Sequence, residues 1–262
     1  MTTLAARTIE ALRSTNETLA AAVRDLPEEA LKGPSGATEW TVAQVLSHLG
    51  SGAEIGLATL TAAVDGTAAP GPDFNPGVWD RWNAMGPREQ ADGFLSHDAR
   101  LVAAFEALTA EQRENLQVKL GFLPAPLPLA AFAGMRLNEA VQHSWDVRVA
   151  ADPAAVLPEE AARVLAEQLS GALSFMTGFI GKADALATPA VVEVKDAGFG
   201  IVIGDAVALQ TEIVDPTATF TGPVESAVRL VGGRLRPEYT PAGVAVTGNV
   251  SLDDLRRVFP GY

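Results

Sequence analysis

The chain contains no cysteine among its 262 residues. Disulfide bonds, zinc ribbons, iron–sulfur clusters and cysteine nucleophiles are therefore excluded, and any thiol chemistry must use a thiol from another molecule. Basic side chains are also scarce, because Lys and Arg number 19 against 32 Asp and Glu, which gives a formal net charge of -13. Such an acidic chain argues against nucleic acid or an anionic membrane surface as its partner.

Long apolar runs are missing as well. No segment offers the roughly 20 uninterrupted apolar residues that a membrane span needs, and the N-terminal stretch MTTLAARTIEALRSTNE has no apolar core of the signal-peptide type. We therefore expect a cytoplasmic protein. The composition, with 48% hydrophobic and 19% charged residues, is typical of a soluble globular protein, and the length favours two domains.

Apolar residues recur at helical spacing through the first two thirds of the chain. The strongest helix start is at Thr41, where Gln44 completes a capping box and the preceding Trp40 is placed to pack on Val45. From these patterns we expect an antiparallel four-helix bundle in a first domain over residues 1–184. The predicted helices cover residues 2–24, 42–64, 79–84, 87–108, 129–150 and 158–180.

The periodicity changes near Ala187, where the sequence begins to alternate and becomes rich in Val and Ile. This alternation predicts two or three short antiparallel strands. Further along we expect strands at 217–220 and 244–247 and helices at 224–232 and 252–259. The sequence thus predicts an α+β protein whose second domain, over residues 185–262, is a small α+β unit.

Chemistry-bearing side chains gather on the helix predicted around residues 129–148. Glu139, His143 and Asp146 follow one another by four and three residues, which places them on one helix face. A carboxylate and an imidazole turned inward are costly to bury unless something binds them, and a metal ion would do so. The alternative is a partly exposed pair in which Glu139 simply hydrogen-bonds His143.

A second histidine strengthens the metal hypothesis. His48 lies on the flank of the apolar stripe of the helix predicted at 42–64, and bundles place metal sites between facing helices. With Glu139 and His143 it supplies two nitrogens and one oxygen, a common catalytic zinc set with an open fourth position, although iron, nickel and manganese also suit it. We interpret His97, in the polar segment SHDAR, as a solvated residue without a role.

Two motifs and the separate tail together point to a known family. The segments WTVAQVLSHL, with His48, and NEAVQHSWDV, with Glu139, His143 and Asp146, resemble the mycothiol-dependent maleylpyruvate isomerase family. The resemblance implies a DinB-like bundle followed by a sterol-carrier-like α+β domain. It also implies that His48, Glu139 and His143 hold a divalent metal, most often zinc, and that the open position takes the thiol of mycothiol.

The resemblance further implies a reaction. The thiolate adds to the cis double bond of maleylpyruvate, the new single bond rotates, and elimination gives fumarylpyruvate, while related members look like S-transferases. In the segment GGRLRPE, Arg234 resembles an arginine that the family's C-terminal domain contributes to the active site, where it would hold an anionic substrate, and Arg236 is its substitute. Asp146 is expected to orient a ligand or to be a plain polar residue near the helix end.

Two other functions remain open from the sequence. An open three-ligand zinc site can also activate water, so a metal-dependent hydrolase with Asp146 as general base is one alternative. The other is a non-catalytic protein that holds the metal structurally and binds a small hydrophobic ligand in its tail. The loops at 66–79 and 121–128 are where we expect the choice of electrophile to be encoded.

Overall fold

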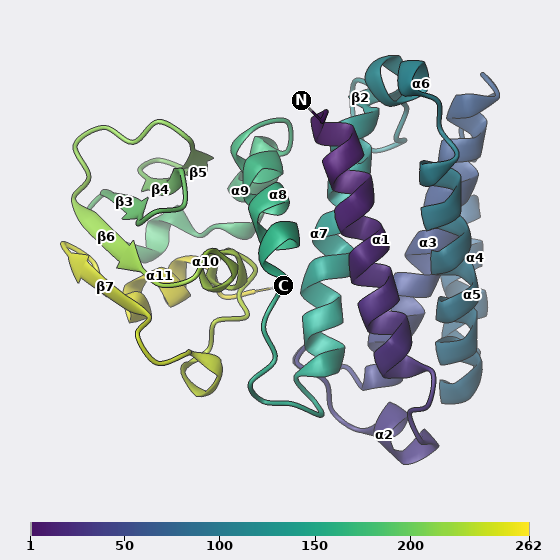
Figure 1. Ribbon diagram of the computed structural model, residues 1–262, viewed down its shortest axis with the longest axis horizontal. Coiled ribbons are helices and arrows are strands. Elements are labelled where there is room, and N and C mark those ends of the chain that lie inside the picture. Colours follow the sequence, from purple (N-terminus) through teal and green to yellow (C-terminus); the bar gives the residue numbers. More distant parts are fainter. Residues whose placement is uncertain (1, 262) are drawn as a thin grey trace. The chain divides into compact units, whose positions relative to one another are not determined.

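The computed structural model describes residues 2–261 and divides the chain into two compact units, Met1–Ala155 and Val156–Tyr262 (Figure 1). This division differs from the boundary expected at residues 184 and 185. The reason is that α8 (Glu159–Ser170) and α9 (Ser174–Ile180) contact strands β4 and β5 of the second unit. The single helix expected at 158–180 is interrupted at Gly171, which ends α8.

The first unit is mainly helical, and its four long helices lie where the apolar periodicity predicts them. Two short helices, α2 and α6, and a two-stranded hairpin were not predicted. The elements are α1 (Leu4–Val23), α2 (Glu28–Lys32), α3 (Val42–Val64), α4 (Phe74–Asn83), α5 (Pro87–Glu106), α6 (Ala110–Asn115), β1 (Gln117–Val118), β2 (Leu127–Pro128) and α7 (Leu129–Arg148).

The helices α1, α3, α5 and α7 form a four-helix bundle in which each contacts two others (Figure 1). The bundle is confirmed, but its helices do not simply alternate in direction. Gly50 of α3 lies against Phe94 of α5, and Gly56 lies against Leu101, so α3 and α5 run the same way. The intervening α4 returns the chain alongside α3 before α5 begins.

Trp82 fastens α4 to the bundle. Its ring is 1% exposed, and a Cβ added at Gly50 or Gly93 would lie 2.1 or 2.9 Å from it, so only glycine at these positions leaves room. The indole donates to Glu54 at 2.9 Å. Contrary to our expectation of a solvated residue, His97 packs edge-on against this ring at 5.4 Å and its side chain is only 26% exposed. Burial lowers the pKa of His97.

The second unit combines a five-stranded sheet with helices, as the change in periodicity predicts. The strand order is β5-β4-β3-β6-β7, with β3 and β6 parallel and the other neighbours antiparallel. The elements are β3 (Ala190–Val194), β4 (Phe199–Ile203), β5 (Val207–Gln210), β6 (Ala218–Thr221), α10 (Val224–Val231), β7 (Ala245–Gly248) and α11 (Leu252–Val258), with short 3₁₀ turns at Ala183–Ala185 and Pro237–Tyr239.

Membrane-spanning helices are not found in the described part of the chain: none of its helices combines the length and the apolar composition needed to cross a bilayer.

Candidate metal centre

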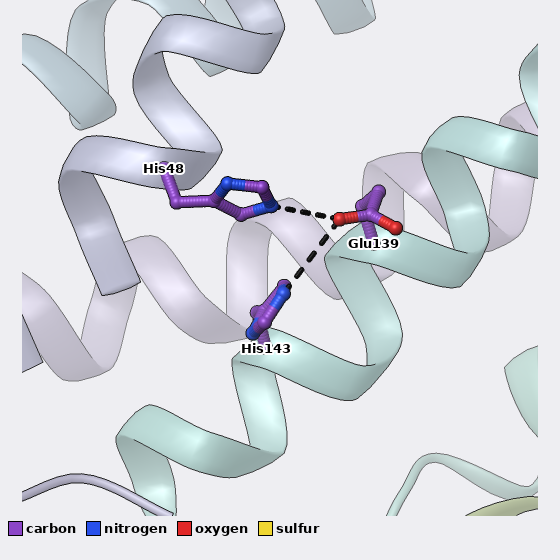
Figure 2. A group of neighbouring side chains, drawn as sticks. All are labelled: His48, Glu139 and His143. Carbon is purple, nitrogen blue, oxygen red and sulfur yellow. Dashed lines mark hydrogen bonds and ion pairs between the residues drawn. The ribbon is translucent and has the colours of Figure 1, made fainter. Parts of the chain in front are cut away.

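Three side chains from two bundle helices converge in the first unit. His48 comes from α3, and Glu139 and His143 come from α7 (Figure 2). The carboxylate oxygen Oε2 of Glu139 lies 2.8 Å from His48 Nε2 and 3.6 Å from His143 Nε2. The structure therefore brings together the three residues that the sequence singled out.

Local helix rules position these donors. On α3, Thr41 Oγ1 accepts from the Gln44 amide at 3.2 Å, and Gln44 Oε1 accepts from the Thr41 amide at 2.8 Å, which is the expected capping box. This box fixes where α3 begins and hence, two turns later, which way His48 points. On α7, Glu139 and His143 are one turn apart and so share a face.

The donor set fits a divalent metal ion. One atom from each residue can be chosen so that all three lie within 4.8 Å of one another. In a tetrahedral zinc site with ligands at about 2.0–2.1 Å, donors are about 3.3–3.5 Å apart, and the observed separations of 2.8 and 3.6 Å bracket that spacing. All three donor atoms are therefore close enough together to be the candidate ligands of one ion.

Exposure differs among the three side chains. His143 is 5% exposed, whereas Glu139 is 31% and His48 40% exposed. The cluster is thus anchored at its buried His143 side and reachable from solvent at its His48 side. A small molecule can approach such a centre, which is what a catalytic site needs and a closed structural site lacks.

Asp146 fixes the orientation of His143. Its side chain is fully buried, and Oδ2 lies 2.8 Å from His143 Nδ1. A carboxylate accepts hydrogen bonds, so Asp146 favours a proton on Nδ1 and leaves Nε2, which lies 3.6 Å from Glu139 Oε2, as the ring nitrogen that can bind a metal. The Asp146 carbonyl also accepts from the Gly36 amide at 2.7 Å, which ties the loop before α3 to the end of α7.

Replacing Asp146 by Asn should weaken metal binding by about 10- to 100-fold, because the amide no longer enforces the His143 tautomer. Competition with a chromophoric chelator measures the dissociation constant. Asp152→Asn is the matched control, since Asp152 is exposed and its side chain accepts a hydrogen bond from the nearby Ala154 amide, outside the cluster. An unchanged dissociation constant in Asp146→Asn would contradict this role.

Glu139 stays ionised at neutral pH. Burial on its own raises the pKa of this carboxyl, but the hydrogen bond with His48 and the charges of His143, His48 and Arg136 outweigh it and lower the pKa from 4.5 to about 2. The carboxylate is therefore available as a ligand without first losing a proton.

This shift predicts how stability depends on acid. Because the folded pKa lies below the unfolded value of 4.5, the stabilisation from ionised Glu139 is present above that pH and is lost as pH falls toward about 2. Between pH 5 and pH 2 the unfolding free energy of the metal-free wild type should fall. We expect this fall to be roughly 1–3 kcal/mol larger than the fall measured for metal-free Glu139→Gln. Denaturant titrations at several pH values measure this, and a constant difference would refute it.

Trp40 is a neighbour of the centre that the sequence reasoning missed. Beyond the expected packing on Val45, which stays a prediction, its ring centroid lies 5.9 Å from that of His143, nearly parallel at 22°, and 5.2 Å from that of His48. The preceding Glu39 adopts a left-handed φ of 71°, a conformation that non-glycine residues rarely take. The indole is 37% exposed and forms an aromatic wall beside the two imidazoles.

Trp40 should report metal binding by fluorescence. Because Co²⁺ quenches nearby indoles and Trp40 lies beside two donors, saturable quenching is expected in the wild type and should be clearly weaker in Trp40→Phe, which keeps Trp145 two residues after His143. Emission is recorded during a Co²⁺ titration of both proteins. Equal quenching in both would place the bound ion elsewhere.

Arg234, predicted to hold an anionic substrate, belongs to the second unit. The residue is 5% exposed, and its Nη1 donates a hydrogen bond to the Gly232 carbonyl at 2.6 Å. Arg236, its substitute, lies over the Tyr239 ring at 5.4 Å. The assignment of Arg234 to the substrate stays a prediction.

Comparison with known proteins places the helical unit in a family. The sequence model of the mycothiol maleylpyruvate isomerase N-terminal domain matches residues 12–148, which is just over half of the chain and includes all three candidate ligands. The chain belongs to this family. The family resemblance of the two sequence motifs is thereby confirmed.

Solved structures share the fold across both units. A crystal structure of the mycothiol-dependent maleylpyruvate isomerase matches with a TM-score of 0.65 and 17% identity, covering 95% of this chain and 98% of the other. A variant of the same enzyme, with one histidine replaced by alanine, matches with a TM-score of 0.64 and 16% identity over the same shares. A search of curated proteins found no match.

Proposed function

We propose that this protein is a metal-dependent enzyme that uses mycothiol to isomerise, or to transfer sulfur to, a small unsaturated electrophile. The observation that carries the proposal is the convergence of His48, Glu139 and His143 within one solvent-reachable cluster. It is supported by the family match over the helical unit and by solved structures named for a mycothiol-dependent maleylpyruvate isomerase.

His48, Glu139 and His143 would hold the metal. Two imidazoles and one carboxylate favour zinc, and iron, nickel or manganese suit the same donors. When bound, a divalent cation lowers the pKa of a coordinated thiol and so supplies thiolate at neutral pH. Because the chain has no cysteine, the sulfur must come from a cosubstrate.

The protein's own groups prepare this chemistry. Asp146 holds the proton on His143 Nδ1, and Glu139 remains a carboxylate because its pKa is about 2. The Trp40 ring lies beside both imidazoles. Arg234 would pair with a carboxylate of the substrate.

The reaction is a reversible addition. The thiolate sulfur forms a bond to one carbon of a cis double bond that is conjugated with a carbonyl. The π electron pair of the double bond moves toward that carbonyl. Rotation about the resulting single bond and expulsion of the thiolate restore the double bond in the trans geometry. In S-transfer the new carbon–sulfur bond is retained and the adjacent carbon takes up a proton.

A hydrolase is less well supported by the geometry. In that reading Asp146 would serve as general base for a metal-bound water, but its side chain is fully buried and faces Nδ1 of His143, on the side of the ring opposite Nε2. The carboxylate is therefore not placed to take a proton from a molecule at the centre.

Product analysis tests the proposal and separates its two forms. We expect the metal-loaded protein to convert maleylpyruvate to its trans isomer with a catalytic amount of mycothiol. Proton NMR of the alkene hydrogens measures this conversion. Consumption of one thiol per product indicates S-transfer. Turnover at the same rate without any thiol would contradict the proposal.

A further inference from the structure

The geometry points to Arg136 as a positioning residue that sets the spacing between the two helices carrying the metal ligands. The inference rests on the proposed metal centre and goes beyond it, because Arg136 is not itself a ligand. It lies on α7, one turn before Glu139, and is 9% exposed.

Arg136 joins α7 to α3 at the level of the centre. Its Nη2 donates to the carbonyl oxygen of Leu49 at 3.0 Å, and Leu49 directly follows His48. Since the acceptor is a main-chain atom of α3, this bond restrains the helix backbone and not merely a mobile side chain. One contact thus links the backbone beside His48 to the helix that carries Glu139 and His143.

The same guanidinium also links α7 to α5 directly and to α1 through Asp98. Arg136 Nη2 forms an ion pair with Asp98 of α5, which is 3% exposed, and Asn16 of α1 donates to the second oxygen of Asp98 at 2.5 Å. Gly52 of α3 leaves room for the group, because a Cβ there would lie 3.2 Å from Arg136 Nη1. All four helices α1, α3, α5 and α7 therefore meet at one polar junction.

A buried ion pair of this kind is weak evidence for stability, because desolvation offsets most of the attraction between the charges, and its best-attested use is to fix one helix register. Here the register matters for chemistry. Metal–ligand distances tolerate deviations of only about 0.2 Å, so a small slip of α7 along α3 separates His48 from Glu139 and weakens the centre without unfolding the bundle.

The test measures Co²⁺ affinity, the visible absorption of bound Co²⁺ and the thermal midpoint of each protein in parallel. Arg136→Lys keeps the charge but offers a single point of contact in place of the planar fork. The double variant Arg136→Met with Asp98→Asn removes the pair without stranding a buried charge. Arg229→Lys is the matched control, because Arg229 is 1% exposed and pairs with Glu225 at 2.8 Å in the second unit.

We expect both Arg136 variants to bind Co²⁺ at least about 10-fold more weakly than the wild type, with altered absorption bands in the folded protein. Arg229→Lys should lower the thermal midpoint and leave the Co²⁺ affinity and bands unchanged. If both Arg136 variants kept the wild-type Co²⁺ affinity and absorption bands, the role of Arg136 would be overturned and the proposed metal centre would stand. Absence of Co²⁺ binding by the wild type would overturn the proposed metal centre, and this inference with it.

Discussion

Replacing His143 by alanine should abolish both metal retention and thiol-dependent turnover. His143 is the most buried of the three donors, at 5% side-chain exposure, and Asp146 holds it in one orientation. Loss of a ligand's hydrogen-bond partner alone costs about 10- to 100-fold in metal affinity or activity, so loss of the ligand itself should cost more than about 100-fold. Metal content after dialysis and the initial isomerisation rate are the two measurements.

His97→Ala is the control for this experiment. His97 lies outside the cluster, against Trp82 and 3.8 Å from Glu54, so its loss should leave metal content near the wild-type value. Turnover by His143→Ala at the wild-type rate would show that the cluster is not the active centre.

Stripping the metal should have an effect of similar size. We expect the chelated, dialysed wild type to fall to a few per cent of its loaded rate or less, since without a cation the thiol keeps a pKa near 8.5 and only about 3% of it is thiolate at pH 7. Adding back one equivalent of Zn²⁺ per chain should restore the rate, and the same addition to His48→Ala should not.

Two results would argue against this account of the metal. Full turnover by the metal-free wild type would remove the cation from the chemistry. Equal recovery of wild type and His48→Ala on adding Zn²⁺ would show that the ion acts somewhere other than between α3 and α7.

Features that depend on neighbours in sequence could be predicted. The capping box of Thr41 and Gln44 fixes the start of α3, and the four-residue step from Glu139 to His143 places both on one face of α7. Both follow from helix geometry alone. That His48 faces this pair does not follow from spacing within one helix. The expected bundle made its place in the site a hypothesis, and the family motifs added support.

Features that depend on distant packing could not be predicted in this way. Asp98 lies in a polar segment that predicts a solvated position, yet it is buried. Its side chain pairs with Arg136, and because Arg136 is 38 residues further along the chain, no local pattern indicates this pairing. Trp40, just before α3, stacks on His143 of α7, about 100 residues later in the chain. The shared direction of α3 and α5 depends on α4, whose anchor Trp82 occupies a slot formed by glycines of two helices.

The most direct test of the proposed function is a calorimetric titration of mycothiol into the metal-loaded wild type and into His48→Ala. The arrangement of His48, Glu139 and His143 predicts saturable binding near one thiol per metal in the wild type, with no binding to the variant. No binding of mycothiol to the fully loaded wild type, measured at two temperatures so that a binding enthalpy near zero is not mistaken for it, would remove mycothiol from the account of this protein.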